Sequence, residues 1–341
     1  ALAVQPVTGK LFAVGTAGVL YAVNPFTGVA AAMGPAFSPT PTGSTFDLAF
    51  DRVTGLLRLF TTSGQNLSIH PATGAVIYTD TAPAYAAGDA NATITPQTVG
   101  ADFAFNGGVQ TLHAIDAARD TFVRISNPAS GQLSTVGMMS FNTETQASLE
   151  IPSGASFAWA SLSLPGATGT GLYVINLSKG NAIFTGAIRT VEQVRDFVIA
   201  PPRDVWKQAC FGTNAGNPQI GGDTADPDGN GVSNLMEYAL GAQPGSQFLA
   251  FMPVPGNAEP YLSLTFVRAA NDVIYTVQVS DDLVTWRDGS SYSPYGDTPV
   301  NAFTTEVSRV MSGGMETIVV RDNVATSASS QRFMRLQVTT P

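Results

Sequence analysis

Short apolar runs separated by turn residues fill the beginning of the chain. Up to Gly34 these runs are LAV, KLFAVG, VLYAVN and VAAAMG. Alternation of Val, Phe, Tyr and Leu with other residues is typical of β-strands, and glycine at the junctions tolerates the backbone angles of tight turns. The pattern therefore predicts four short strands in this stretch.

The same pattern repeats along the first 200 positions. Thr-Gly pairs end at Gly9, Gly28, Gly55 and Gly74, so the distances from Gly9 to Gly55 and from Gly28 to Gly74 are both 46 residues. Two further copies read LHAIDAARDTFVRISNPASGQLSTVG, with a turn at Gly131, and GLYVINLSKGNAIFTG. Four strands in about 40 to 50 residues are typical of a β-propeller blade. A β-sandwich with coincidental spacing is the alternative. The propeller is favoured because two different turns of the repeat recur at the same 46-residue spacing.

A small apolar run opens each repeat and suits the crowded innermost strand beside a propeller axis. Its copies are Leu2-Ala3-Val4, Asp47-Leu48-Ala49-Phe50, Asp102-Phe103-Ala104-Phe105, Phe157-Ala158-Trp159 and Asp196-Phe197-Val198-Ile199. Pro201-Pro202 follow the fifth copy, so a ring of about five blades is incomplete and lacks three strands. Two sources stay open for them: a longer natural chain of which this is a part, or another molecule that adds strands.

Three stretches of the first 200 residues resemble a family of secreted bacterial domains marked by repeated LYxxNxxTG units. Leu20–Asn24 and Leu172–Asn176 carry the unit, 63–67 (SGQNL) resembles the central GQNLR-like motif, and 85–91 (YAAGDAN) resembles the next stretch. The resemblance covers Leu2 to Pro201 and implies a propeller-like domain, normally with about three further strands before this starting point. It brings no established activity. Ser68 stands where arginine is usual, which argues against an arginine-dependent ligand site.

Residues 223–237, DTADPDGNGVSNLME, satisfy the pattern of an EF-hand loop. Calcium prefers side-chain oxygens at loop positions one, three and five, a carbonyl at seven, and a bidentate carboxylate at twelve. Gly231 supplies the sharp turn at position six. The predicted ligands are Asp226, Asp228, Asn230, the carbonyl of Val232, Asn234 and Glu237, with Asp223 as an accessory ligand.

Two short helices are expected around this loop. Asp204 is a candidate cap for a helix through Trp206 and Phe211, and residues 235–240 fit a helix that ends at Gly241. The region resembles a module of secreted proteins from Verrucomicrobia-like bacteria, in which a Trp, an FG pair, a DPDGDG-type loop and an EYALG helix precede a terminal β domain. One loop without a partner loop indicates a structural calcium clip at millimolar affinity and not a sensor.

Alternating strands also fill the C-terminal hundred residues, which read YLSLTFVRA, VIYTVQVSDDLVTW, TTEVSRVM, METIVVRD and QRFMRLQV. Five or more antiparallel strands in this length favour an immunoglobulin- or fibronectin-like sandwich. The sequence thus predicts an all-β protein with a β-propeller-like repeat domain at 1–202. A calcium-loop linker at 203–245 joins it to a β-sandwich domain at 246–341.

Composition removes several classes of function. A net charge of −9 argues against nucleic acid, and one cysteine in 341 residues excludes a disulfide framework. The apolar runs are strand-sized, so we expect no membrane span. Catalytic patterns such as G-x-S-x-G and H-E-x-x-H do not occur, so we expect no enzyme. We expect the side chains of His70, His113, Cys210 and Trp286 to have structural roles. The same is expected of the aspartates at the heads of the inner strands, Asp47, Asp102 and Asp196. The alternative for these aspartates is a ring of carboxylates at one mouth of the propeller channel.

These patterns favour a secreted, calcium-stabilised protein with a structural or adhesive role at the cell surface or in the matrix. The most specific version of this hypothesis is a subunit that self-associates, or joins other surface proteins, by strand complementation. We expect any signal peptide to have been removed. The alternative is a module that binds carbohydrate or another polymer without catalysis, through the propeller face or through Trp286.

Overall fold

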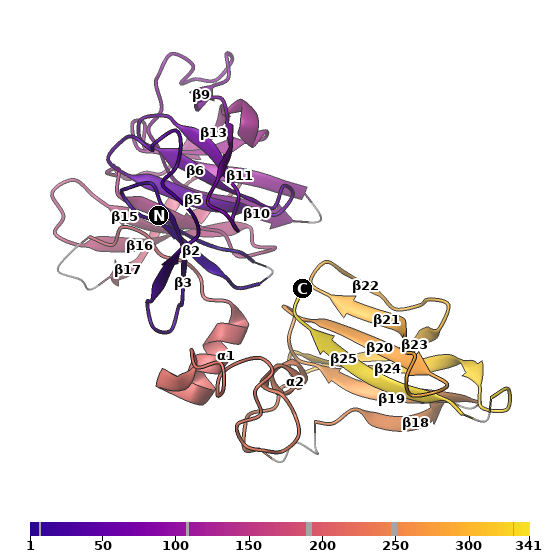
Figure 1. Ribbon diagram of the computed structural model, residues 1–341. Helices are drawn as coiled ribbons and strands as arrows, with labels where there is room; N and C mark the ends of the chain where they lie inside the picture. The colour runs from indigo at the N-terminus through magenta and orange to yellow at the C-terminus, as the bar shows by residue number, and fades with distance from the viewer. Residues whose placement is uncertain (7, 107–108, 189–192, 247–250, 259, 330) are drawn as a thin grey trace. The chain divides into compact units, whose positions relative to one another are not determined.

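The computed structural model describes residues 1–341 except 7, 107–108, 189–192, 247–250, 259 and 330 (Figure 1). The chain forms two compact units, residues 1–200 and 201–341, and each is described by itself. Neither of the α-helices in the described residues is long and apolar enough to cross a membrane.

The described residues of unit 1 form four sheets, one for each sequence repeat (Figure 1). Four strands per repeat, as the sequence predicted, are paired antiparallel in chain order. The first two sheets are β1 (Leu2–Val4), β2 (Leu11–Val14), β3 (Leu20–Val23) and β4 (Ala30–Ala32), then β5 (Phe46–Asp51), β6 (Leu56–Thr61), β7 (Asn66–Ile69) and β8 (Val76–Thr79). The third is β10 (Thr98–Asn106), β11 (Val109–Asp116), β12 (Thr121–Ile125) and β13 (Gln132–Met138), and the fourth is β14 (Ala147–Glu150), β15 (Phe157–Ser163), β16 (Thr170–Asn176) and β17 (Ala182–Ile188).

The third sheet has an extra strand. β9 (Ala84–Tyr85) follows the second sheet in sequence but pairs in parallel with β13, so that Leu133 is opposite Tyr85. The chain therefore crosses to the outer edge of the third sheet before it forms that sheet's first strand. Sequence patterning did not predict this strand, because two residues are too few to show alternation.

The first strands of the four sheets lie side by side: β1 contacts β5, β5 contacts β10, and β10 contacts β14. The innermost strand of the fourth sheet is therefore Ala147–Glu150, and the prediction that it is Phe157–Trp159 was wrong, because those residues lie in the second strand, β15. Among the described residues the sheets form no closed propeller. The segment 193–200 occupies the place after β14 and pairs with no described strand.

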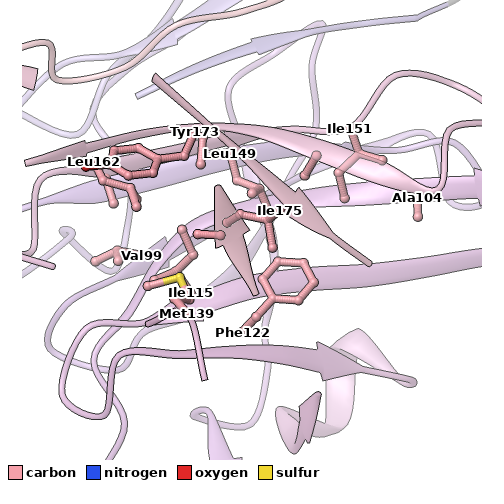
Figure 2. Packing of buried hydrophobic residues seen from close by; sticks show 14 residues of the cluster. Val99, Ala104, Ile115, Phe122, Met139, Leu149, Ile151, Leu162, Tyr173 and Ile175 are labelled. Carbon is pink, nitrogen blue, oxygen red and sulfur yellow. The ribbon is translucent and has the colours of Figure 1, made fainter. Parts of the chain in front are cut away.

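Apolar layers fill the space between consecutive sheets. Phe12, Leu20 and Leu57 belong to the layer between the first two sheets, and Phe60 and Leu112 to the next. Figure 2 shows the layer between the third and fourth sheets, where Ile115 and Phe122 lie near Leu149, Tyr173 and Ile175. Full burial of each such side chain contributes about 1.5–3 kcal/mol, so these layers are the main stabilising contact between sheets.

Glycines govern both the turns and the contacts between sheets. The turn glycines of the repeats, among them Gly28, Gly74 and Gly180, have φ between +63° and +72°, as the Thr-Gly spacing predicted. Two other glycines, Gly34 and Gly137, lie where there is no room for a side chain. A Cβ atom on Gly34 would lie 2.0 Å from the carbonyl oxygen of Thr73, and one on Gly137 would lie 2.0 Å from that of Lys179. Both glycines thus let one sheet touch a turn of the next.

In the part of unit 2 that the structure describes, there are two α-helices, α1 (Pro202–Phe211) and α2 (Asn234–Leu240), and two four-stranded sheets. A 3-10 turn, Gly212–Asn214, follows α1. One sheet has the order β18 (Val254–Ala258), β19 (Tyr261–Arg268), β24 (Met315–Ala325) and β23 (Thr304–Ser312). The other has the order β22 (Gly296–Thr298), β21 (Arg287–Ser293), β20 (Ile274–Ser280) and β25 (Phe333–Thr339).

One apolar core joins both sheets of unit 2 to α2. Phe266 and Ile318 come from the first sheet, Tyr275 and Tyr292 from the second, and Leu240 from the helix. The segment predicted as a linker, 203–245, thus contributes to this core. Helix α1 begins at Pro202, and Asp204 lies inside its first turn without capping it, because proline suits the first helical position. Gly241 ends α2 at φ +79°, as predicted.

Candidate functional site

The predicted calcium ligands share one hydrogen-bonded loop. Asp226 accepts hydrogen bonds from the backbone N–H groups of Asn230 at 3.1 Å and Gly231 at 2.9 Å. The side-chain amide of Asn230 donates to Asp228 at 3.0 Å and to Glu237 at 3.1 Å. One amide nitrogen therefore lies between two carboxylates, the position in which a positive charge is most favourable.

Helix α2 presents two buried acceptors on this side of the loop. Glu237 is 1% exposed and Asn234 is fully buried, and the Oε2 atom of Glu237 and the Oδ1 atom of Asn234 have no hydrogen-bond partner. The amide group of Asn234 donates to the carbonyl oxygens of Ile220 and Gly222 at 2.7 and 2.8 Å, which fixes its orientation. A buried acceptor without a donor costs about 1–3 kcal/mol, and an oxygen-seeking cation would remove that cost.

The remaining two predicted ligands are the Val232 carbonyl and Asp223. The Asp223 carboxylate has other partners, because it forms ion pairs with Lys207 at 2.7 Å and Arg203 at 3.4 Å, and both of these belong to α1. In the described residues no three His, Cys, Asp or Glu side chains are arranged to hold a metal ion. The side-chain nitrogen of Asn230 faces Asp228 and Glu237, and its oxygen accepts from the Val232 N–H at 2.8 Å. Calcium coordination by Asn230 would therefore require its amide to turn and to give up the hydrogen bond from Val232.

A second group of carboxylates lies along the inner strands of unit 1. Asp47 accepts a hydrogen bond from the N–H of Ala101 in the next inner strand, and Asp102 accepts one from Ile151 at 2.7 Å. Asp196 accepts one from Leu2 at 2.5 Å, across 194 positions of sequence. The strand-head aspartates thus bond neighbouring inner segments, and the contact from Asp196 to Leu2 brings the fifth inner segment against the first strand.

The sequence analysis overlooked Glu150, a fourth member of this group. Glu150 ends β14 and accepts a hydrogen bond from the N–H of Ile199. Its position could have been found, because Glu150 and Asp196 are 46 residues apart, the length of the repeat. The misplaced inner strand of the fourth repeat hid that spacing.

Protein surrounds these four carboxyl groups, although three of them keep part of their surface accessible. Burial is the largest cause that raises the pKa of Asp102, to about 7, and it raises the pKa of Asp196 as well. The pKa values of Asp47 and Glu150 lie well above the ordinary range, first through burial and then through the neighbouring negative charges.

The fifth inner segment borders two apolar faces that no sheet covers in the described residues. In the first sheet, Ala3 and Phe12 pack toward the second sheet, whereas Leu2, Ala13 and Tyr21 are paired on the other face and are half-buried. In the fourth sheet, Tyr173 and Ile175 pack toward the third sheet. Phe157, Trp159 and Val174 are half-buried and Ile183 is 60% exposed on its other face.

The polar residues of the GQN stretch hold sheets together. Gln65 accepts a hydrogen bond from the N–H of Thr42 at 2.5 Å, and Asn66 donates to the carbonyl oxygens of Thr81 and Pro128, both at 2.9 Å. Ser68 lies opposite Arg58 in the β6–β7 pair. Asn66 thus connects the second sheet to the turn before β13 in the third.

Asp80 connects Arg58 and Ser68. Its carboxylate accepts hydrogen bonds from Arg58 at 2.9 Å and from Ser68 at 2.7 Å. The resemblance places arginine at position 68, and in this chain a guanidinium comes from the opposite strand instead. Arg58 also donates to Asn66 at 2.6 Å, so this arginine has a role within the fold.

The YAAGDAN stretch holds β9 against the third sheet. The Tyr85 hydroxyl donates to Asp116 at 2.6 Å, and Asp89 accepts from the N–H of Thr135 at 2.7 Å. Asn91 accepts from Arg119 at 3.1 Å. Every polar side chain in this stretch therefore has a partner that explains it without a ligand.

The histidines, Cys210 and Trp286 each have contacts that explain them within the fold. His113 stacks on Phe122, and burial lowers its pKa to about 4. His70 accepts from the N–H of Ala72 at 3.2 Å in its turn. Cys210 is half-buried in α1. Trp286 lies under the guanidinium of Arg335, 4.0 Å from its ring centre.

Four-stranded sheets repeated in chain order, with their first strands side by side, define an all-β repeat protein. The chain belongs to the DUF4394 family, a domain of unknown function, whose family model matches residues 1–198. No curated protein matches the chain.

Several solved structures share a weak likeness. Hydrazine synthase of Kuenenia stuttgartiensis is 12% identical over 55% of this chain and 48% of that chain, with a TM-score of 0.35. Dihydro-heme d1 dehydrogenase NirN in complex with DHE is 8% identical over 92% and 49%, with a TM-score of 0.34. The Dos1 propeller is 11% identical over 91% and 74%, with a TM-score of 0.33. This chain spans about half the length of the first two. TM-scores this low say nothing about function.

Proposed function

We propose that the protein is a secreted, non-catalytic building block of a bacterial cell surface or matrix, with a structural or adhesive role. The proposal extends to its architecture: unit 1 is a propeller whose fifth blade has only its inner segment among the described residues, and unit 2 ends in a β-sandwich. Strands from a partner molecule complete the fifth blade, and calcium stabilises the loop at 223–237.

The segment 193–200 is the observation that carries this proposal. Hydrogen bonds hold it between β14 and β1, but its own edge pairs with no described strand. Half-buried apolar residues such as Trp159 and Tyr21 line the faces of the sheets on either side. An unpaired edge beside apolar faces favours strand addition, because backbone hydrogen bonds and apolar burial are gained together.

A sizing experiment tests the assembly. We expect the full chain with calcium to form larger species as its concentration rises, measured by light scattering and negative-stain electron microscopy. The Val198→Pro variant removes an N–H group from the open edge and should remain monomeric. Thr16→Pro is the matched control, because Thr16 is exposed and lies at the second position of the turn that the Gly18 N–H closes onto the Gly15 carbonyl, where proline is favoured. A wild-type chain that stays monomeric at high concentration contradicts the proposal.

Calcium binding is supported by the two orphaned acceptors of α2. When bound, the ion would supply positive charge to Asp226, Asp228 and Glu237, with Asn230, Asn234 and the Val232 carbonyl as neutral ligands. We expect EDTA to lower the melting temperature of the wild-type chain and to leave that of Asp228→Ala unchanged. Asp281→Ala, in an exposed ion pair, is the control that should keep the EDTA effect. An identical wild-type melt with and without EDTA contradicts a stabilising ion.

The second candidate is a module that binds carbohydrate without catalysis. Trp286 favours it, because the ring is half-buried beside an exposed loop tip in which Leu283 is 56% and Val284 82% exposed. Aromatic rings at such places stack on sugars. Retention on a polysaccharide matrix that Trp286→Ala abolishes would support this function, and no retention on any matrix would contradict it.

A further inference from the structure

The four inner carboxyl groups occupy four successive joints between inner segments. Asp47 joins β5 to β10, Asp102 joins β10 to the residue after β14, Glu150 joins β14 to segment 193–200, and Asp196 joins that segment to β1. Each joint has the same chemistry: a side-chain carboxyl accepts the backbone N–H of the next segment. The last two joints are the only described contacts of this kind that hold 193–200 in place.

These carboxyl groups affect one another. The charges of Asp102 and Asp196 disfavour ionisation of Glu150, and the charge of Asp196 does the same for Asp47 and Asp102. The Arg52 guanidinium opposes this effect and favours ionisation of Asp102. Four acids in one group cannot all ionise without repulsion.

We infer that the four inner carboxyl groups form a pH-dependent lock. A hydrogen bond from a backbone N–H favours ionisation of each carboxyl group, but several charges in this buried group repel one another. While most of the groups are protonated, segment 193–200 and β1 stay packed together, and ionisation of several of them loosens these two joints by repulsion. The inference is independent of the proposed assembly, because it concerns contacts within one molecule.

The direction follows from proton linkage. A carboxyl group whose pKa is raised in the folded protein keeps a proton that the unfolded chain has released. Its stabilising contribution is therefore complete below the unfolded pKa near 4, and it is lost as pH rises through the folded pKa, which is about 7 for Asp102. His113 acts in the opposite direction between about 4 and 6.5, so pH values above 6.5 separate the two effects.

Hydrogen exchange on the full chain tests the lock. The experiment compares protection factors at pH 6.5 and 8.5 for peptides that cover 193–200 and the β1–β2 region. We expect protection to fall by roughly tenfold per proton released as the pH passes one unit above the folded pKa. The quadruple variant Asp47→Asn, Asp102→Asn, Glu150→Gln and Asp196→Asn keeps an acceptor at each joint and should show equal protection at both pH values.

A matched control and two single variants complete the experiment. Asp89 also accepts a backbone N–H, but its pKa is lowered, so Asp89→Asn should keep the wild-type pH dependence. If the quadruple variant does not fold, Asp102→Asn and Asp196→Asn alone should each reduce the pH dependence. Wild-type protection that is constant or increases from pH 6.5 to 8.5 would overturn the inference, as would an unchanged dependence in these variants.

Discussion

At the scale of single residues, the buried ion pair between Arg58 and Asp80 shows what polar side chains do in unit 1. The side chains are 6% and 13% exposed, and the guanidinium also bonds Asn66. Removal of water from two charges is costly, and further hydrogen bonds offset part of that cost. Its contacts reach two strands of the second sheet and the Pro128 carbonyl of the third.

We predict that Asp80→Asn destabilises the protein by about 3 kcal/mol or more, because it leaves the Arg58 charge buried without its counter-ion. Urea unfolding monitored by circular dichroism measures the change. Asp281→Asn is the control, since its pair with Arg287 is exposed and such pairs contribute about 0–1 kcal/mol. Equal effects of the two substitutions would show that the buried pair has no special role.

At the scale of elements, contacts between sheets depend on glycines that lie outside the tight turns. Gly137 touches the Lys179 carbonyl of the fourth sheet as Gly34 touches the Thr73 carbonyl of the second. The same contact thus occurs twice in the chain, between the first and second sheets and between the third and fourth.

We predict that Gly137→Ala lowers the free energy of unfolding by about 1–3 kcal/mol, because the new methyl group forces two sheets apart. Gly88→Ala is the matched control, since no heavy atom lies within 4 Å of the position its Cβ would take. Urea unfolding of both variants and of the wild-type chain measures the change in the free energy of unfolding. A Gly137 variant as stable as the control would mean that the sheets adjust freely.

The sequence predicted the elements that depend on local chemistry. Strands in the repeats, positive φ at Gly28 and Gly180, and the helix that ends at Gly241 all follow from neighbouring residues. β14 escaped prediction because Ala147–Glu150 is short and half polar. In the candidate sites, the loop spacing identified the hydrogen-bonded residues Asp226 to Glu237. The pairing of Asp223 with Arg203 was not predictable, because it depends on how α1 packs 20 positions upstream.

At the scale of the whole molecule, two units with separate cores are expected to respond to different conditions. The candidate calcium loop belongs to unit 2, and the four inner carboxyl groups belong to unit 1.

We predict two transitions in differential scanning calorimetry of the full chain. EDTA should lower one transition, and a change from pH 6.5 to 8.5 should lower the other by several degrees. The separate fragments 1–200 and 201–341 serve as controls that assign each transition. A single transition that responds equally to chelation and to pH would contradict independent units.

The crossing of β9 to the third sheet has a mechanical consequence. When the chain is pulled from the side of the second sheet, tension reaches the third sheet first at β9, which is bonded to β13 and held by Tyr85 and Asp89. The inner strand β10 comes later in the chain and carries no load until those bonds break. We therefore expect a force-extension trace to show the loss of the β9–β13 pair before the third sheet unfolds.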